Sequence, residues 1–387
     1  MDALDVIVVG AGPAGSWLAY RLACAGARVA IYDPSHPREK PCGGGVTGRA
    51  LALVAPALRQ PLPSVAIGGA VFEYGERRAA VALDVYAPGD DPRDIPLVVT
   101  GRRDLDTALL AAAIAAGAEH RPERVTRLTR SGGRWAIETR RGAIEADWII
   151  GADGTNSLVR RHVARPFSRA DLSIATGYFV HGVSSDTIDI AFENQPAGYL
   201  WSFPRPDHLA VGMCAQADVS NAPTLLSRAR RWIDDHAPRH AALERYSWPI
   251  PSLTAGALAA EAPGGAGWML VGDAAGLVDP ITREGIFFAL CSADLAASAL
   301  LAGVAPSVQY AAAVRSELYA ELTRAARLKA RFFQPSFMSL LVTALQSSAR
   351  VQRVMADLVA GRQSYRGLRR RLLATLEWKL MVGLFGR

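Results

Sequence analysis

Gly10-Ala11-Gly12-Pro13-Ala14-Gly15 is the stretch that decides the fold of this chain. It follows the apolar run 4–9 and opens a predicted helix over 16–25. A GxGxxG pattern between a strand and a helix is typical of a dinucleotide site, whereas glycine-rich turns by themselves are common. Gly10 permits a tight turn, Gly12 lets the backbone approach a pyrophosphate, and Gly15 lets the helix pack close to the strand. The phosphates then meet unpaired N–H groups at the positive end of the helix.

Two further glycine motifs follow predicted strands farther along the chain. Gly151-Ala152-Asp153-Gly154 comes after the apolar residues 148–150, and Gly272-Asp273-Ala274-Ala275-Gly276 comes after 268–271. Asp33 ends the strand after the first helix, 18 positions past Gly15, where a carboxylate can bind ribose hydroxyls. The order of these motifs along the chain predicts that it binds FAD.

Length and composition indicate a large enzyme without a membrane span. The 387 residues exceed what one hydrophobic core usually spans, so two domains are expected. Half of the residues are hydrophobic and 20% are charged, as in globular proteins with a large interior. The longest apolar stretch, 286–305, contains Asp294 and is interpreted as a buried helix. Because no basic residue precedes the first apolar run, we expect no signal peptide and a cytoplasmic location.

Metal and nucleic-acid sites are not predicted. The four cysteines, Cys24, Cys42, Cys214 and Cys291, are widely spaced and suggest reduced thiols, not a zinc site or a disulfide framework. The net charge is +7, but no nucleic-acid recognition fold is visible.

The positive charge is densest near the C-terminus. The basic residues there are Arg362, Arg366, Arg369, Arg370, Arg371 and Lys379. They stand beside Trp378 and a run of leucines, and an amphipathic basic helix with Trp is typical of an element at a membrane surface. A packed C-terminal helix with an arginine-rich exposed face explains the pattern equally well, so both interpretations stay open.

The predicted fold class is α/β. Because the three nucleotide motifs must converge on one ligand, we expect a discontinuous, Rossmann-like FAD-binding domain formed by residues 1–62, 97–165 and 262–305. An inserted antiparallel β-sheet substrate domain is predicted over 63–96 and 166–261, with a Pro/Asp/Gly-rich loop at 88–96. Residues 306–387 form a predicted C-terminal helical region, with a break at Pro335.

Three other stretches resemble the geranylgeranyl reductase family. They are Lys40-Pro41-Cys42-Gly43-Gly44-Gly45-Val46, Tyr199-Leu200-Trp201-Ser202-Phe203-Pro204 and Asp279-Pro280-Ile281-Thr282-Arg283-Glu284-Gly285-Ile286. Members of this family are FAD enzymes that saturate isolated double bonds of polyprenyl chains, on the fold of para-hydroxybenzoate hydroxylase. The resemblance covers most of the chain up to about Leu301.

The resemblance also implies residue roles around FAD. Arg102 would contact the flavin, Asp153 would help order the cofactor side, and Asp273 would bind the ribityl chain. The turn 280–285 would face the isoalloxazine ring, where a helix N-terminus stabilises the negative charge of a reduced flavin. Arg283 stands where many relatives have a small residue. The predicted cofactor-binding residues are Gly10, Gly12, Pro13, Ala14, Gly15, Asp33, Cys42, Gly43, Gly44, Arg102, Asp153, Gly272, Asp273, Pro280, Glu284, Gly285 and Ile286.

The predicted catalytic residues are Cys42, Tyr199, Trp201 and Phe203. The three aromatic residues alternate along a predicted strand and so share one face, which suits apolar packing and a cationic transition state; a core stripe is the other interpretation. Cys42 lies among glycines, either as a proton donor or as packing against the flavin. Lys40 is interpreted as a substrate-phosphate contact or as a solvated loop charge.

The sequence therefore predicts a flavin-dependent reductase that saturates isolated double bonds of a polyprenyl (geranylgeranyl-type) chain. Hydride would come from the flavin and a proton from the protein. NAD(P)H or another donor would bind without being retained, and the enzyme would be cytoplasmic or peripheral at the inner membrane face, with an isoprenoid lipid as substrate. A first alternative is an FAD-dependent monooxygenase or halogenase, because 201–204 partly matches the halogenase WxWxIP pattern. A second is a non-catalytic lipid carrier.

Overall fold

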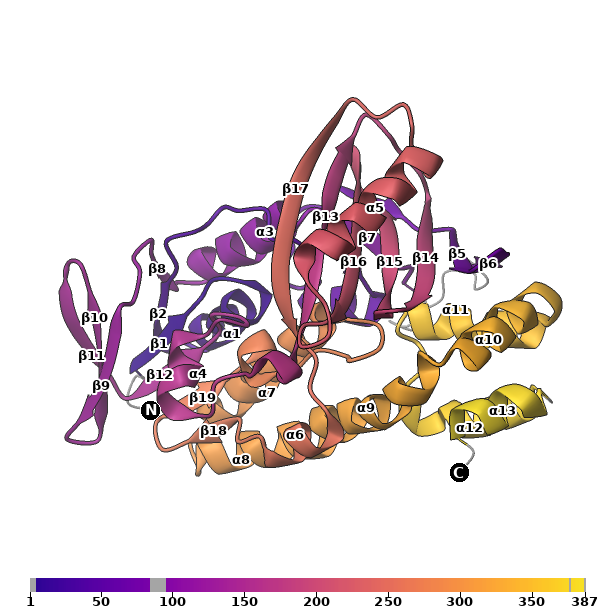
Figure 1. Ribbon diagram of the computed structural model, residues 1–387. Helices are drawn as coiled ribbons and strands as arrows, with labels where there is room; N and C mark the ends of the chain where they lie inside the picture. The colour runs from indigo at the N-terminus through magenta and orange to yellow at the C-terminus, as the bar shows by residue number, and fades with distance from the viewer. Residues whose placement is uncertain (1–4, 84–94, 376, 386–387) are drawn as a thin grey trace.

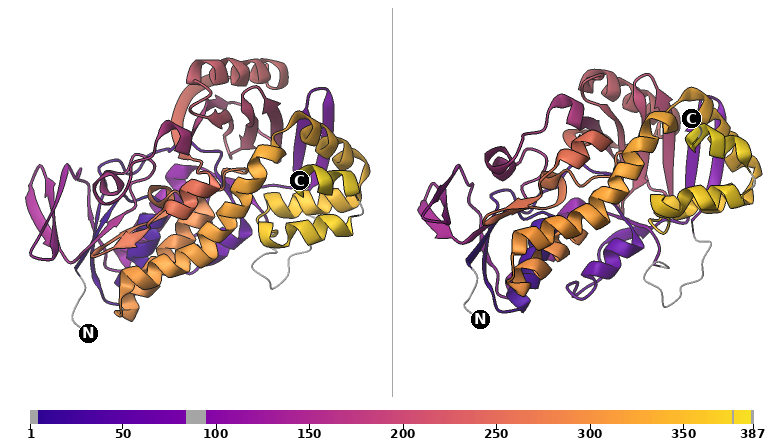
Figure 2. Two further views of the ribbon diagram at one scale, coloured as in Figure 1. Left: turned by 60° about the horizontal axis from the view of Figure 1, so that its bottom comes forward. Right: turned by 90° about the horizontal axis from the view of Figure 1, so that it is seen from below.

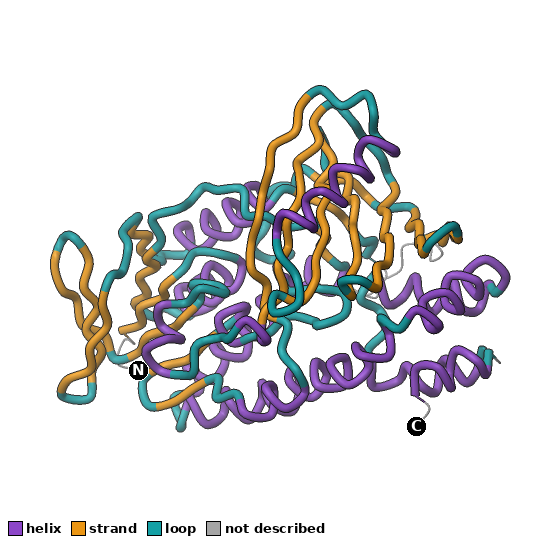
Figure 3. Tube along the Cα trace, viewed as in Figure 1, coloured by secondary structure: helices purple, strands orange, loops and turns teal. Residues whose placement is uncertain are grey.

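A computed structural model describes residues 5–83, 95–375 and 377–385. The loop predicted over 88–96 lies mostly outside these described residues. Figure 1 shows two sheets that stand beside each other, with the C-terminal helices packed along both. Figure 3 shows that strands dominate the middle of the molecule and helices its lower side in that view.

A mostly parallel sheet carries the nucleotide motifs. Its described strands, in spatial order, are β18 (Gly264–Gly265), β19 (Trp268–Leu270), β12 (Trp148–Gly151), β1 (Asp5–Val9), β2 (Arg28–Tyr32) and β8 (Glu119–Arg121). In the register of β1 with its two neighbours, Val9 lies opposite both Tyr32 and Gly151. The carboxyl ends of these strands therefore meet at one edge, where parallel α/β sheets bind ligands. The predicted Rossmann-like α/β class is confirmed.

Helices pack against this sheet and against one another. The helix α1 (Pro13–Cys24) begins directly after the glycine loop and buries Trp17, Leu18 and Leu22 in the core. It packs against α3 (Arg102–Ala115) and against α7 (Ile286–Ala302), the helix that follows the last nucleotide motif. Shorter helices α2 (Gly48–Val54), α4 (Leu158–Val163) and α6 (Ala255–Ala260) and 3-10 turns at Arg169–Asp171 and Gly272–Ala275 complete this part.

A larger, mostly antiparallel sheet packs beside the first. Its described strands, in spatial order, are β17 (Ala242–Pro251), β13 (Leu172–His181), β16 (His208–Gln216), β15 (Ala197–Pro204), β14 (Thr187–Asn194), β5 (Gly69–Tyr74) and β6 (Arg77–Ala82). Alternate side chains of β15 enter different cores: Leu200 packs under α5 (Ala222–His236), whereas Tyr199 and Trp201 pack toward the C-terminal helices. This period-two alternation gives the sheet two buried faces.

Two small antiparallel sheets complete the β-structure of the described chain. One consists of β3 (Gly45–Val46), β7 (Val98–Thr100) and β4 (Ser64–Ala66), and the other of β11 (Gly142–Ala146), β10 (Arg134–Thr139) and β9 (Arg127–Ser131). The first lies next to the Cys42 loop, whereas the second projects from the far end of the molecule (Figure 1).

The C-terminal region is helical, as predicted. Its helices are α8 (Pro306–Ala313), a π-helical turn (Val314–Tyr319), α9 (Ala320–Phe332), α10 (Pro335–Ser347), α11 (Ala349–Val359), α12 (Tyr365–Ala374) and α13 (Trp378–Phe385). The predicted break at Pro335 is confirmed, since α9 ends at Phe332 and α10 begins at the proline. The views of Figure 2 show α10–α13 beside the β5–β6 end of the antiparallel sheet.

The prediction of one amphipathic helix near the C-terminus is wrong in one respect. Two helices, α12 and α13, meet at Thr375. The Thr375 hydroxyl donates to the Leu372 carbonyl at 2.7 Å and accepts from the Glu377 amide at 3.3 Å, so its side chain competes with the helical backbone bonds. Within the described residues, no helix has both the length and the apolar character needed to cross a membrane.

Candidate active site

A cavity of about 300 Å³ lies where the parallel sheet, the antiparallel sheet and the C-terminal helices meet. Its two ends differ in chemistry. One end is lined by the glycine loop and by polar residues that include Lys40, Arg102 and Asp273. The other is lined by apolar side chains of α9 to α13, among them Phe337 and Leu372. A ligand that fills this cavity thus needs a polar part and a long apolar part.

The glycine loop has the shape required for a pyrophosphate. A Cβ on Gly15 would lie 1.9 Å from the Gly10 carbonyl oxygen, and one on Gly10 would lie 2.4 Å from the Ala152 carbonyl oxygen. Glycine is therefore required at both positions on the protein side of the loop. A Cβ on Gly12, the N-cap of α1, would meet nothing within 4 Å, and Gly12 lines the cavity. The loop is closed toward the protein and open toward the cavity, which fits FAD.

Asp33 is buried beside this loop. Its carboxylate accepts the Ala11 amide at 2.9 Å and the Ser35 amide at 2.8 Å. Burial raises the pKa of Asp33, but the hydrogen bonds from Ala11 and Ser35 outweigh burial and hold the pKa below its ordinary value. The carboxylate is therefore charged at neutral pH and joins β2 to the glycine loop.

Asp153 fixes the motif 151–154 to the start of α4. Its carboxylate accepts the amides of Leu158 at 2.6 Å and of Val159 at 3.3 Å, at the start of α4. Its neighbours Ala152 and Gly154 line the cavity, whereas the Asp153 side chain is committed to the helix. The geometry suits an ordering role and not direct contact with a ligand.

Two buried ion pairs stand at the polar end of the cavity. Arg102 binds Asp106 through two hydrogen bonds of 2.9 and 2.8 Å. Lys40 Nζ lies 2.9 Å from Asp273 Oδ2, so neither predicted role of Lys40 describes its contact here: the ammonium is partnered and largely buried. Burial raises the pKa of Asp273, but Lys40, Arg102 and a hydrogen bond from Thr155 together outweigh burial and keep the pKa below its ordinary value.

Cys42 lies on a loop that requires glycine at the two positions that follow it. A Cβ on Gly43 would lie 2.7 Å from the Phe203 ring, and Gly44 has a φ of +87° with the Thr100 carbonyl oxygen 2.3 Å from its Cβ position. The Cys42 Sγ accepts the Gly44 amide at 3.4 Å and lines the cavity. The glycines therefore let the Cys42 loop lie close to the Phe203 ring of β15.

The turn 280–285 is fixed on several sides. The Asp279 carboxylate accepts the amides of Ile281 at 2.7 Å and Thr282 at 3.0 Å. Glu284 accepts the Thr47 hydroxyl at 2.9 Å and pairs with Arg49 at 2.5 Å, so its carboxylate positions the turn against α2. Pro280 is the first residue of the turn, Gly285 is the N-cap of α7, and Ile286 is the first residue of that helix.

Tyr199, Trp201 and Phe203 line the cavity together, on one face of β15. The Tyr199 hydroxyl donates to the Thr282 carbonyl at 2.7 Å. Burial raises the pKa of Tyr199 well above its ordinary value, so the phenol keeps its proton, and that proton is committed to the turn. Tyr199 thus anchors the turn, while Trp201 and Phe203 supply the apolar surface.

Arg205 and Glu39 were missed by the sequence interpretation. Arg205 is only 1% exposed and binds Glu39 at 2.5 Å and the Cys42 carbonyl at 2.7 Å. Glu39 also accepts the amides of Arg102 and Arg103, each at 3.0 Å. These contacts join the Cys42 loop, β15 and α3. The available signal was a charged residue between two prolines directly after β15.

Comparisons with known proteins agree with this geometry. The family model described as FAD binding domain matches residues 3–303. The digeranylgeranylglycerophospholipid reductase of Methanothrix thermoacetophila is 30% identical over 303 residues, which are 74% of this chain and 74% of that protein. The menaquinone reductase of Mycolicibacterium smegmatis is 30% identical over 326 residues, or 77% and 76% of the two chains.

Solved structures share the fold. The crystal structure of a geranylgeranyl bacteriochlorophyll reductase-like protein from Thermoplasma acidophilum has a TM-score of 0.77 and 23% identity, covering 97% of this chain and 100% of that one. Two flavin-dependent halogenases share the fold at TM-scores of 0.61 and 0.65, with 19% and 16% identity. At such identities the likeness concerns the fold alone.

Proposed function

This chain belongs to the geranylgeranyl reductase family of FAD binding domain proteins, and we propose that it saturates isolated double bonds of a polyprenyl chain. It is an FAD-dependent oxidoreductase, which removes the lipid-carrier alternative. The observation that carries the proposal is the single cavity that joins the glycine loop to an apolar space under α9 to α13. A polyprenyl chain needs such a space, because transferring apolar surface out of water is favourable.

The described residues suit the work that such a reaction requires. Bound FAD would supply the hydride, and NAD(P)H or another transient donor would supply the electrons. The N-terminus of α7, next to the turn 280–285, stabilises negative charge there. The face of Trp201 stabilises positive charge that develops on an alkene carbon. The apolar walls exclude water.

Cys42 is our proposed proton donor. Among the four predicted catalytic side chains, only Cys42 and Tyr199 carry a proton on a heteroatom that suits transfer, and the Tyr199 proton is held by Thr282 at 2.7 Å. The Cys42 Sγ accepts the Gly44 amide, so its own proton is free to point into the cavity. Trp201 and Phe203 then position the alkene.

The direct test is anaerobic incubation of the photoreduced, FAD-loaded protein with polyprenyl diphosphates, followed by mass spectrometry. We expect products that gain two hydrogens for each reduced bond. Oxygenated or halogenated products under aerobic conditions with a halide, and no hydrogenated product under anaerobic ones, would favour the monooxygenase or halogenase alternative.

Replacing Cys42 by alanine is expected to separate the two half-reactions. Reduction of the prenyl substrate should fall by about 10² or more, because a positioned proton donor contributes that much. Reduction of the flavin by an artificial donor should stay within about twofold, since it needs no proton donor for an alkene. Stopped-flow traces measure both rates, and Cys24→Ala, at an exposed cysteine, is the control. Equal losses in both half-reactions would show that Cys42 supports the cofactor only.

We also propose that α12 and α13 dock on an anionic membrane surface. Their inner faces line the cavity through Leu368, Leu372, Leu380 and Leu384. Their outer faces carry Trp378, 60% exposed, and Val382, 58% exposed and one turn further along α13. The exposed basic residues are Arg366, Arg369, Arg370 and Lys379. Basic side chains around exposed apolar ones are typical of an interfacial element.

The predicted cluster of six basic residues is thus reduced to four. Arg362 and Arg371 both bind Asp357, on α11, and hold the helices together. The packed-helix interpretation describes Arg362 and Arg371, and the membrane interpretation is our proposal for the four exposed basic residues. The helices α12 and α13 line the cavity on one side and are exposed on the other. A lipid chain would therefore have a short path from the bilayer to the cavity.

A further inference from the structure

Two basic side chains, Arg283 and Lys329, meet at Ser252, beside the turn 280–285. Arg283 Nη1 donates to the Ser252 hydroxyl, and Lys329 Nζ donates to the same oxygen at 2.9 Å. Lys329 also donates to Gln216 Oε1 at 2.6 Å. Within the described chain, neither cation forms an ion pair with a carboxylate. The turn, the ends of β16 and β17 and the helix α9 therefore converge on these two basic side chains.

Arg283 is held in an unfavourable backbone conformation. Its φ of +63° lies in the left-handed region, which residues other than glycine rarely adopt. Its Nε is buried and has no hydrogen-bond partner in the part of the chain that the structure describes. Arg283 also lines the cavity. Strain of this kind persists where surrounding contacts enforce it, and it clusters at ligand-binding positions.

The surroundings of Lys329 lower the pKa of its amine. Burial, together with the positive charge of Arg283, lowers the pKa of Lys329 to about 7. Asp218 and Cys214 act in the opposite direction but do not restore the ordinary value. An anion between the two side chains would remove the repulsion and favour the protonated amine.

We propose that Arg283 and Lys329, joined through Ser252, form a subsite for the phosphate group of the prenyl substrate. The inference rests on the proposed function and deepens it by naming the substrate class as phosphate-bearing prenyl compounds. A guanidinium offers two parallel N–H donors to a phosphate, and a lysine adds a point charge. With the phosphate at the turn, the apolar chain would extend past Leu328 and along the C-terminal helices that line the cavity.

A neutral headgroup would leave both cations without a counter-charge. The subsite therefore predicts that the enzyme prefers phosphate-bearing prenyl compounds to neutral ones. A phosphate can also come from the electron donor, NADPH. The shared chemistry is a phosphate oxyanion, and the experiment below separates its two sources. A purely structural contact between α9 and the turn would instead affect thermal stability and leave anion binding unchanged.

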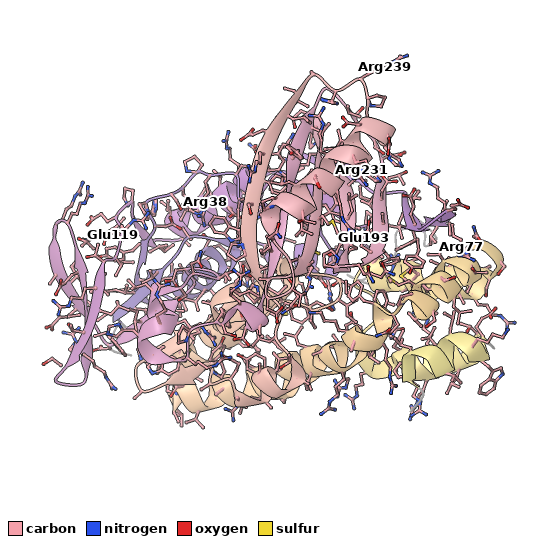
Figure 4. The ribbon with its side chains drawn as sticks, in the orientation of Figure 1. Arg38, Arg77, Glu119, Glu193, Arg231 and Arg239 are labelled. Atoms are coloured by element: carbon pink, nitrogen blue, oxygen red, sulfur yellow. The ribbon has the colours of Figure 1, made fainter. Side chains whose placement is uncertain are left out.

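The first measurement is calorimetric titration of the FAD-loaded full chain with inorganic pyrophosphate. The variants are Lys329→Met, on a helix, and Arg283→Gly, which suits the positive φ and so keeps the turn. We expect each variant to bind pyrophosphate at least about tenfold more weakly, because a charge-assisted hydrogen bond is lost. The control is Arg239→Gln at the tip of the antiparallel sheet (Figure 4), a residue that does not line the cavity.

The second measurement compares KM for geranylgeranyl diphosphate with KM for geranylgeraniol. In the wild-type protein the diphosphate should have the lower KM, and Lys329→Met and Arg283→Gly should reduce this preference about tenfold. Arg239→Gln should leave the preference unchanged. An unchanged preference together with unchanged pyrophosphate affinity would overturn the subsite.

Other outcomes separate the remaining explanations. If the variants weaken NADPH-driven turnover but not dithionite-driven turnover, the phosphate belongs to the donor and the assignment to the prenyl headgroup is overturned. If the wild-type protein binds pyrophosphate through these residues but reduces no prenyl compound, the anion site stands and the proposed function fails. Lower melting temperatures with normal pyrophosphate binding would show a structural contact only and reject the subsite.

Discussion

A glutamine in place of Gly12 is expected to leave the chain folded and free of FAD. Gly12 has a φ of −69° and a ψ of −175°, a conformation that any residue adopts, and its Cβ position faces open space. The side chain would thus not clash with the protein. It would occupy the place of the pyrophosphate and block the N-terminus of α1, so we expect FAD affinity to fall by about 100-fold or more.

Flavin absorbance relative to protein absorbance after gel filtration measures the occupancy, and circular dichroism measures the fold. The matched control is Gly68→Gln, because a Cβ on Gly68 also meets nothing within 4 Å and its backbone is not in the left-handed region. Gly68→Gln should keep about one FAD per chain. Full FAD occupancy in Gly12→Gln would show that the loop does not hold the pyrophosphate.

The second large effect is expected at the outer surface of α12 and α13. Changing Arg366, Arg369, Arg370 and Lys379 to glutamine removes the exposed positive charge of this surface. Each basic side chain near an anionic membrane contributes about 1 kcal/mol, so the four changes should weaken binding to anionic liposomes by about 10³-fold. Raised salt should weaken the binding of the unchanged protein, since these contacts act within about 10 Å at 0.1 M ionic strength.

Co-sedimentation with liposomes that contain or lack anionic lipid measures this binding. The control changes four exposed arginines elsewhere, Arg124, Arg140, Arg231 and Arg239, to glutamine. It has the same net charge as the α12–α13 variant, and Figure 4 places Arg231 and Arg239 far from these helices. Equal weakening by both variants would indicate a general charge effect. Binding that ignores anionic lipid altogether would show that α12 and α13 only pack.

The fold and the cofactor end of the site could be predicted because their signals are local. Gly10, Gly12 and Gly15 are needed by a turn of six residues, and the strand before it and the helix after it show their own periodicity. Tyr199, Trp201 and Phe203 alternate, and period two in a strand places them on one face wherever that strand lies. Such patterns need no knowledge of the rest of the chain.

The contacts of the charged residues could not be predicted in this way. Lys40 and Asp273 are 233 positions apart, and the partners of Arg205 and of Arg283 are also distant in sequence. No period or motif relates such residues, so Lys40 was interpreted as a solvated charge or a phosphate contact although it is paired. For the same reason, the sequence did not show which C-terminal arginines are packed and which are exposed.

The sequence by itself determined the Rossmann-like α/β fold and the glycine loop that suits FAD, because these depend on short-range steric and periodic requirements of the backbone. It also indicated the family, through the resemblance of three short motifs. Only the tertiary structure decided which side chains meet. It set the apolar inner faces of α12 and α13 against the cavity, tied Tyr199 to the turn, and brought Lys329 to Arg283. The physical reason is that burial and pairing of side chains follow from the packing of elements that are remote in sequence, which no local pattern encodes.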